Sequence, residues 1–122
     1  MVDRQITSLP TNLTLVGSRL QFVPNYGPEG ILIVLGGIVG DVGGKPQDFA
    51  VLPIFDPAGK RWYNQTTTGE APAGRAEHCV SGKPSPNGTY EIFVYGGHRF
   101  TFSSSALSFD TIHILTLPSF HW

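Results

Sequence analysis

The chain has 122 residues, of which 40% are hydrophobic and only 14% are charged, and its formal net charge is −1. This length allows one domain at most, and the apolar content is too high for a disordered chain. The near-neutral charge and the absence of a basic cluster exclude the electrostatic signature of a nucleic-acid-binding protein. No apolar stretch reaches 18 residues, so no membrane span is expected, and the 15 glycines and 10 prolines suit short strands joined by turns.

The first part of the chain contains two predicted strands. Residues 1–13 show no hydrophobic period and are interpreted as a lead-in or as the outer strand of a preceding unit. Met1–Gln5 carries a charge pair and no apolar core segment, which argues against a signal peptide. Thr14–Val23 alternates and predicts a strand, and Ile31–Leu35 is an apolar run typical of a strand buried on both faces.

A long glycine-rich connection, Ile38–Gln47, separates this run from two further predicted strands. Phe49–Phe55 is the third strand and the more polar Arg61–Thr67 is the fourth. The intervening Asp56-Pro57-Ala58-Gly59 has an aspartate, a proline and a glycine at the positions that a β-turn favours. Residues 14–70 therefore form a first four-stranded unit.

The pattern restarts after the link Gly69–Gly74, and residues 71–122 form a second unit. Its loops are Ser81–Gly88 and His98–Ser108, and Phe120–Trp122 is the start of a truncated outer strand. No helix is predicted. The strands predicted in this unit are Arg75–Val80, Tyr90–Tyr95 and Phe109–Leu117.

Two apolar runs end in glycine pairs that lie 60 residues apart, from Gly37 to Gly97. In each unit the next tryptophan follows the pair by 25 residues, and the chain has no other tryptophan. Self-similarity at a fixed period of this size is the signature of stacked supersecondary units.

These features resemble the kelch repeat. In that repeat, four apolar residues, a glycine pair and a loop are followed by an aromatic or apolar residue and, after six intervening residues, by a tryptophan. Pro72–His78 looks like the family's Pro-x-x-Arg-x-x-His entry into a blade, whereas the first unit has no histidine at the matching place. The amino-acid sequence is also similar to the sequences of fungal kelch proteins. The repeat residues are Gly36, Gly37, Phe55, Trp62, Arg75, His78, Gly96, Gly97, Leu115 and Trp122.

The resemblance implies an all-β fold of two four-stranded antiparallel kelch blades, a partial β-propeller. It also implies that the glycines and tryptophans are structural, and that Arg75 and His78 hydrogen-bond the link between blades. Propellers have about four to eight blades, so further blades or self-association are expected to be needed for closure. The outer faces, with residues such as Ile31, Ile33, Phe93 and Tyr95, are expected to stay partly exposed.

The leading hypothesis for function is a non-catalytic scaffold that presents loops to another protein, because variable loops on a rigid frame commonly carry function. The alternative is a fragment of a kelch-propeller enzyme resembling copper-radical sugar oxidases, which need tyrosine, cysteine and histidine around one metal. No catalytic motif appears, and neither a metal site nor a cofactor is expected. The candidate partner-binding residues in the loops are Asp41, Lys45, His98, Arg99, Phe100 and Phe102.

Three N-glycosylation sequons begin at Asn12, Asn64 and Asn87. Asn87 lies in a predicted turn and is the better acceptor, whereas Asn64 lies within a predicted strand. The sequons favour a secreted or membrane-anchored parent protein, whereas the missing signal peptide favours the cytoplasm, so the sequence leaves the compartment open.

Overall fold

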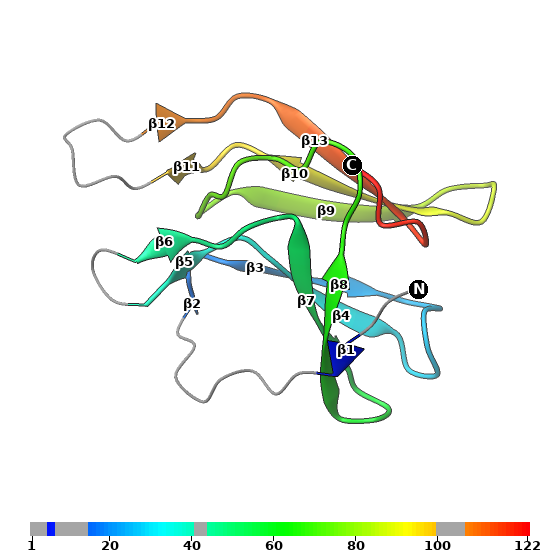
Figure 1. Cartoon of the computed structure of the whole chain (residues 1–122). Coiled ribbons are helices and arrows are strands. Elements are labelled where there is room, and N and C mark those ends of the chain that lie inside the picture. The colour runs from blue at the N-terminus through cyan, green and yellow to red at the C-terminus, as the bar shows by residue number, and fades with distance from the viewer. Residues whose placement is uncertain (1–4, 7–14, 41–43, 100–106) are drawn as a thin grey trace.

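All secondary structure in the computed structural model is β-structure, and no helix occurs in residues 5–6, 15–40, 44–99 and 107–122, the part that the structure describes. Accordingly, this part contains no helix that could cross a membrane. Two antiparallel sheets stack face to face, with smaller ladders at one end (Figure 1). The predicted all-β fold is confirmed.

The first sheet is a four-stranded antiparallel unit in chain order, with a short fifth strand at one edge. The fifth strand, β1 (Gln5–Ile6), pairs with the last strand of the unit, with Gln5 opposite Asn64. The turn at Asp56 forms as its chemistry predicts, because the Ala58 amide donates to the Asp56 carboxylate at 3.1 Å. The four strands are β3 (Arg19–Val23), β4 (Ile31–Leu35), β7 (Val51–Asp56) and β8 (Arg61–Thr66).

The second sheet has three antiparallel strands: β9 (Cys79–Pro84), β10 (Tyr90–Tyr95) and β13 (Ile112–Leu117). The truncated outer strand expected at Phe120–Trp122 forms a single antiparallel bridge to this sheet rather than a ladder. His121 and Thr116 of β13 exchange two backbone hydrogen bonds, of 2.9 and 3.2 Å. The Trp122 amide also donates to the Thr68 carbonyl at 2.9 Å, so these residues join the second sheet to the chain that leaves the first.

Some predicted strand bounds are wrong. The strand expected at Arg75–Val80 runs over Cys79–Pro84, because the residues from Arg75 to His78 are held in the link between the sheets. The strand expected at Thr14–Val23 is interrupted at Gly17, where φ is 69°. Its first piece is β2 (Leu15–Val16).

The two long connections begin and end as short ladders rather than as open loops. Their strands are too short to leave a periodic signal in the sequence. After β4 the chain forms β5 (Ile38–Val39) and β6 (Lys45–Pro46), and after β10 it forms β11 (His98–Arg99) and β12 (Leu107–Ser108).

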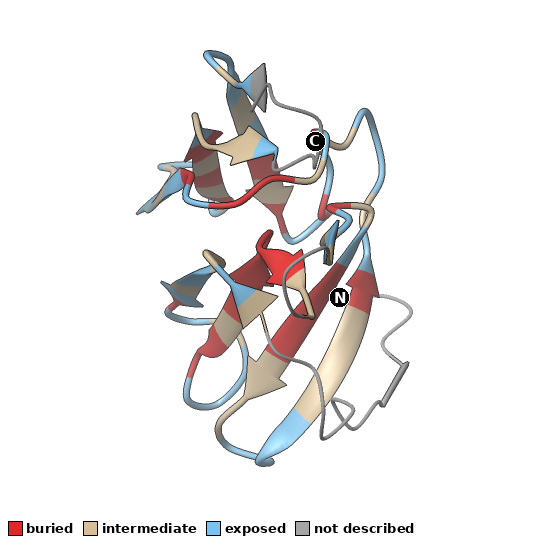
Figure 2. Ribbon diagram, turned by 90° about the vertical axis from the view of Figure 1, so that its left-hand side faces the viewer, coloured by how far each residue is buried: buried red, intermediate tan, exposed pale blue. Residues whose placement is uncertain are grey.

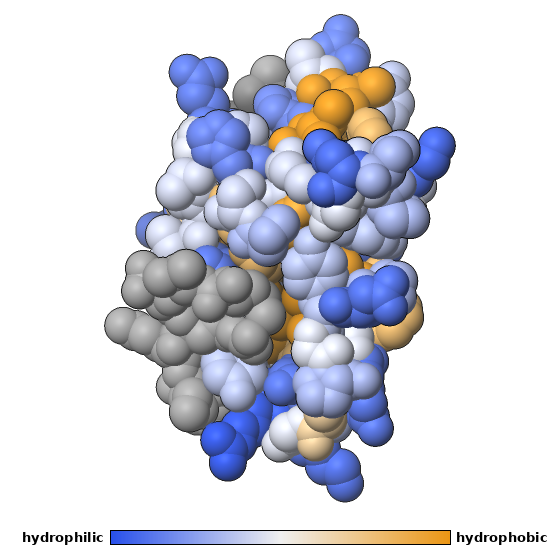
Figure 3. Space-filling view, turned by 90° about the vertical axis from the view of Figure 1, so that its right-hand side faces the viewer, coloured by the Kyte–Doolittle hydropathy of each residue, from blue (hydrophilic) through white to orange (hydrophobic). Residues whose placement is uncertain are grey.

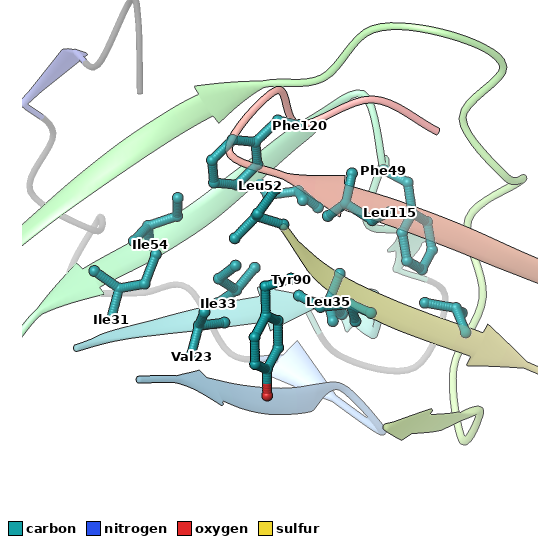
Figure 4. Close-up of a cluster of buried hydrophobic side chains, with 13 residues drawn as sticks. Val23, Ile31, Ile33, Leu35, Phe49, Leu52, Ile54, Tyr90, Leu115 and Phe120 are labelled. Carbon is teal, nitrogen blue, oxygen red and sulfur yellow. The ribbon is translucent and has the colours of Figure 1, made fainter. Parts of the chain in front are cut away.

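The hydrophobic core lies between the two sheets (Figures 2 and 4). Every second residue of β4 faces it, and Tyr90, Ile92 and Val94 of β10 do so from the other side. Phe49 and Trp122 extend the core toward the link, with ring centroids 5.7 Å apart and the indole N–H donating to the Phe49 carbonyl at 3.3 Å. The other main members are Ile31, Ile33, Leu35, Leu52, Ile54, Leu115 and Leu117.

Of the expectations about burial, one is confirmed and one is wrong. The face of β10 that carries Tyr95 is open as expected, because nothing described covers it, and Tyr95 is 48% exposed. Ile31 and Ile33 were expected on an outer face and lie instead fully buried between the sheets. The outward face of the first sheet carries other apolar residues, among them Leu20 and Phe22.

The two tryptophans of the repeat occupy different environments. Trp62 faces Phe55 across the β7–β8 ladder, with ring centroids 5.1 Å apart, and is half-buried. Trp122 contacts Phe49, which lies in the connection between β6 and β7, while Leu115 is buried in the core. Equal spacing therefore does not produce equal contacts, because the described residues of the second sheet form no strand that corresponds to β8.

Candidate partner-binding face

Both glycine pairs turn the chain out of a buried strand and into the stem of a loop. Gly36 and Gly37 have φ of 67° and 98°, and Gly96 and Gly97 have 72° and 83°. Residues with a Cβ atom adopt this left-handed region only at a cost. The β5–β6 and β11–β12 stems consequently leave the two sheets at the same end of the molecule (Figure 1). We call this end the glycine-pair end.

The link between the sheets is hydrogen-bonded to both units at the glycine-pair end. The Gly37 amide donates to the Arg75 carbonyl at 2.8 Å. Ala76 and His98 exchange two backbone hydrogen bonds, each 3.0 Å long. Backbone bonds to both sheets therefore hold the link in one conformation and place it between the two loop stems.

Glycine is needed at this end because the link approaches so closely. A Cβ atom on Gly36 would lie 2.5 Å from His78 Cε1 and 2.6 Å from the Arg75 carbonyl oxygen. A Cβ atom on Gly97 would lie 2.7 Å from the Ala76 carbonyl oxygen. One glycine of each pair thus makes room for the same short segment.

Arg75 joins the link to the second unit from a buried position, with 1% of its surface exposed. Its guanidinium donates from Nη1 to the Gly96 carbonyl and from Nε to the Ala73 carbonyl, both at 3.1 Å. The guanidinium carbon also lies 3.9 Å from the centre of the Phe109 ring, a cation–π contact. Burial lowers the pKa of Arg75.

His78 is fully buried beside Arg75, with its ring centroid 5.8 Å from that of Phe49. Neither ring nitrogen has a well-formed hydrogen bond within the described residues. Burial lowers the pKa of His78 to about 4, helped by the positive charges of Arg19 and Arg75 and opposed by the backbone at Leu35. The imidazole is therefore neutral at physiological pH.

We expect this histidine to make folding sensitive to mild acid. An unfolded-state pKa of 6.5 against about 4 in the folded chain means that the unfolded chain binds the proton first. The contribution of His78 to the free energy of unfolding should be fully present above about pH 6.5. It should fall by about 3 kcal/mol toward pH 4, at 1.36 kcal/mol per pKa unit. Urea unfolding at several pH values measures the loss. An NMR titration placing the His78 pKa near 6.5 would contradict the prediction.

The exposed residues at the glycine-pair end are mostly charged. Lys45 in β6 and Arg99 in β11 are exposed on neighbouring stems. His98 lies 3.3 Å from the Glu77 carboxylate, whose side chain is 57% exposed. Three of the six predicted loop residues therefore come together here, whereas Asp41, Phe100 and Phe102 lie outside the described residues.

Glu77 belongs to this face and sequence reasoning missed it. It occupies a variable position between Arg75 and His78, so the repeat pattern gave no signal. Its φ of 57° turns the side chain out of the link, and its amide donates to the Gly17 carbonyl at 2.8 Å. Only the folded link shows that Glu77 lies beside His98.

Within the described residues, no group of three or more histidine, cysteine, aspartate or glutamate side chains could hold a metal ion. Cys79 is exposed at the start of β9, opposite Tyr95. The structure thus offers no support for the copper-oxidase alternative.

Comparison with known proteins finds one protein whose sequence is similar to this chain. A protein of Arthroderma benhamiae described as "Kelch repeat-containing protein" is 28% identical over 104 residues, which cover 84% of this chain. The repeat that the sequence resembles is therefore also the one that describes this relative. The fungal source of the relative is consistent with the likeness to fungal kelch proteins, and no family model and no solved structure matches the chain.

The glycine pairs recur in both units, whereas the Arg75–His78 link lies once between the two sheets. In a β-propeller, each blade is likewise packed against its neighbours. The matched region spans 15% of the length of the Arthroderma relative.

Proposed function

We propose that this kelch chain is a non-catalytic scaffold that binds another protein at the glycine-pair end. The observation that carries the proposal is the convergence of two loop stems on one rigid link. Arg75 holds the link by hydrogen bonds and His78 is buried beside it, whereas Lys45, Glu77 and Arg99 are exposed at this end. Variable loops on a rigid frame are the usual location of a binding site.

The chemistry of this end suits a protein surface better than a nucleic acid. Its described charges have both signs, because Lys45 and Arg99 are exposed cations and Glu77 is an exposed carboxylate. A nucleic-acid site would need a continuous basic patch, which the net charge of −1 also disfavours. Mixed charge around an interface favours the correct partner and rejects others by like-charge repulsion.

Replacing Arg99 by glutamate should weaken partner binding and leave folding intact. Arg99 is exposed and its backbone is already paired with Leu107. Its reversal should therefore change the free energy of unfolding by no more than about 0.5 kcal/mol, as for ordinary surface changes. The measurement is quantitative affinity capture from the source organism with wild-type and variant chains, alongside urea unfolding.

The matched control for this experiment is Lys60→Glu. Lys60 is also an exposed cation, but it lies in the β7–β8 turn, at the far end of β7 from the loop stems. Proteins that the wild type and the Lys60 variant capture, and that the Arg99 variant loses, would support the proposal. Equal capture by all three chains would contradict a binding role for this end.

We further propose that the outward faces of both sheets are covered by additional blades or by copies of the same chain. The outward face of the second sheet carries an apolar patch, visible at the top of Figure 3. The first sheet has its own patch on the opposite side. The exposed apolar residues are Leu20, Phe22 and Val51 on the first sheet and Tyr95, Ile112 and Ile114 on the second.

The repeat itself indicates how such faces would fit. The repeat period is 60 residues, so Ile33 and Ile54 of the first sheet correspond to Phe93 and Ile114 of the second. Ile33 and Ile54 face the core, whereas Phe93 and Ile114 lie on the outward face. The outward face of the second sheet thus corresponds to the inner face of the first. That inner face already packs against a second sheet, so the two outward faces of the chain should fit each other.

A further inference from the structure

The hairpin between β9 and β10 carries a sequon at its tip. The Gly88 amide donates to the Ser85 carbonyl at 3.1 Å, which places Pro86 and Asn87 at the two central positions of a turn. Proline and asparagine suit those positions because one fixes φ and the other tolerates the turn conformation. The triplet Asn87-Gly88-Thr89 has no proline in its middle position, as an N-glycosylation acceptor requires.

The two functional side chains of this sequon are already in contact. Asn87 Oδ1 lies 2.9 Å from Thr89 Oγ1 and accepts a hydrogen bond from the Thr89 backbone amide at 3.4 Å. The Thr89 hydroxyl also lies 2.9 Å from Glu91 Oε1, so its single hydrogen is shared between the two acceptors. A backbone amide can only donate, so the accepting atom is the carbonyl oxygen of the side chain. The amide nitrogen, which would carry the sugar, is consequently left without a hydrogen bond inside the described part of the chain.

The tip of this hairpin has room for a bulky group. Asn87 and Gly88 are both exposed, and a Cβ atom built on Gly88 would meet nothing within 4 Å. The tip also lies at the opposite end of β10 from the glycine pair (Figure 1). A glycan at Asn87 would therefore leave the proposed partner-binding end uncovered.

The second described sequon, at Asn64, has different surroundings. Asn64 is half-buried in β8 and is paired with Pro53 on one side and Gln5 on the other. Its neighbour Gln65 is only 5% exposed. Asn64 shares the outward face of the sheet with Trp62, so a glycan there would stand where a neighbouring blade would pack. The third sequon, at Asn12, lies outside the described residues.

We propose that Asn87 is the acceptor of an N-linked glycan when the chain folds in a secretory compartment, and that Asn64 is not. The sugar donor is an oligosaccharide carried on a lipid diphosphate. The bond from its anomeric carbon to a phosphate oxygen breaks, and a bond to Asn87 Nδ2 forms. The amide loses one proton, and the lipid diphosphate leaves with the electron pair of the broken bond.

The test is the intact mass of the full chain secreted from yeast behind a cleavable leader, before and after treatment with peptide N-glycosidase. Asn87→Gln should remove the mass of one glycan, whereas Asn64→Gln should keep the glycan and differ from the wild type only by the mass of the added methylene. Thr89→Ala should behave as Asn87→Gln, and Thr89→Ser should retain the sugar. A wild-type chain without sugar, a glycosylated mass unchanged by Asn87→Gln, or a glycan lost in Asn64→Gln would each overturn the proposal.

Discussion

Gly36→Ala should destabilise the chain by about 3 kcal/mol or more. A left-handed φ of 67° costs an alanine about 1–2 kcal/mol, and the added methyl would overlap the His78 ring and the Arg75 carbonyl. Neither neighbour can retreat easily, because the ring is fully buried and the carbonyl accepts the hydrogen bond from Gly37. Overpacking of this kind typically costs about 1–3 kcal/mol. Urea unfolding measures the loss.

Gly88→Ala is the control that separates backbone strain from overlap. Its φ is 88°, so alanine meets a similar conformational cost, but nothing lies within 4 Å of the added atom. We expect a loss of about 1–2 kcal/mol at Gly88, from conformational strain alone. Equal losses at Gly36 and Gly88 would show that the close approach of the link contributes nothing to stability.

The parts of the fold that sequence reasoning predicted are those determined by local chemistry and by repetition. Ile31–Leu35 and Tyr90–Tyr95 form strands with the predicted bounds, because apolar runs closed by turn signals define their own ends. The glycine pairs marked the repeat, and the repeat gave the resemblance to kelch proteins. None of these features required knowledge of a distant contact.

The parts that sequence reasoning could not predict depend on contacts between distant residues. The strand expected from Arg75 starts at Cys79, because the intervening residues bond to Gly37, His98 and Gly17 instead of to a sheet. The pairing of β1 with β8 joins segments almost sixty residues apart. The contact between Glu77 and His98 likewise exists only because the link crosses between the two sheets.

We expect copies of the chain to assemble through their outward faces in a head-to-tail contact rather than a symmetric one. Because the outward face of the second sheet is the repeat counterpart of the first sheet's inner face, it should pack against the first sheet's outward face in another copy. That contact is heterologous, and each copy retains one open face for the next. The chain should therefore form assemblies larger than a dimer, with a mass that rises with concentration in light scattering.

Two single substitutions test this geometry. Ile112→Asp places a charge on the second sheet's patch, where Ile112 is 62% exposed, and Phe22→Asp does the same on the first sheet, where Phe22 is 48% exposed. Each variant alone should be monomeric. Every contact joins the first sheet's outward face of one copy to the second sheet's outward face of another, and each variant carries a charge on one of these faces. An equimolar mixture should form one-to-one dimers and nothing larger, because each variant supplies the face that the other lacks.

The outcomes differ for the other arrangements. If like faces paired with like, Ile112→Asp would still dimerise through its intact first sheet, and mixing would add nothing. If the wild-type chain stayed monomeric at all concentrations, its outward faces would not bind each other. The matched control is Lys60→Asp, which introduces the same side chain at an exposed position in the β7–β8 turn. This variant should assemble as the wild type does, because Lys60 lies outside both patches. Dimers that appear only on mixing would therefore identify the head-to-tail contact.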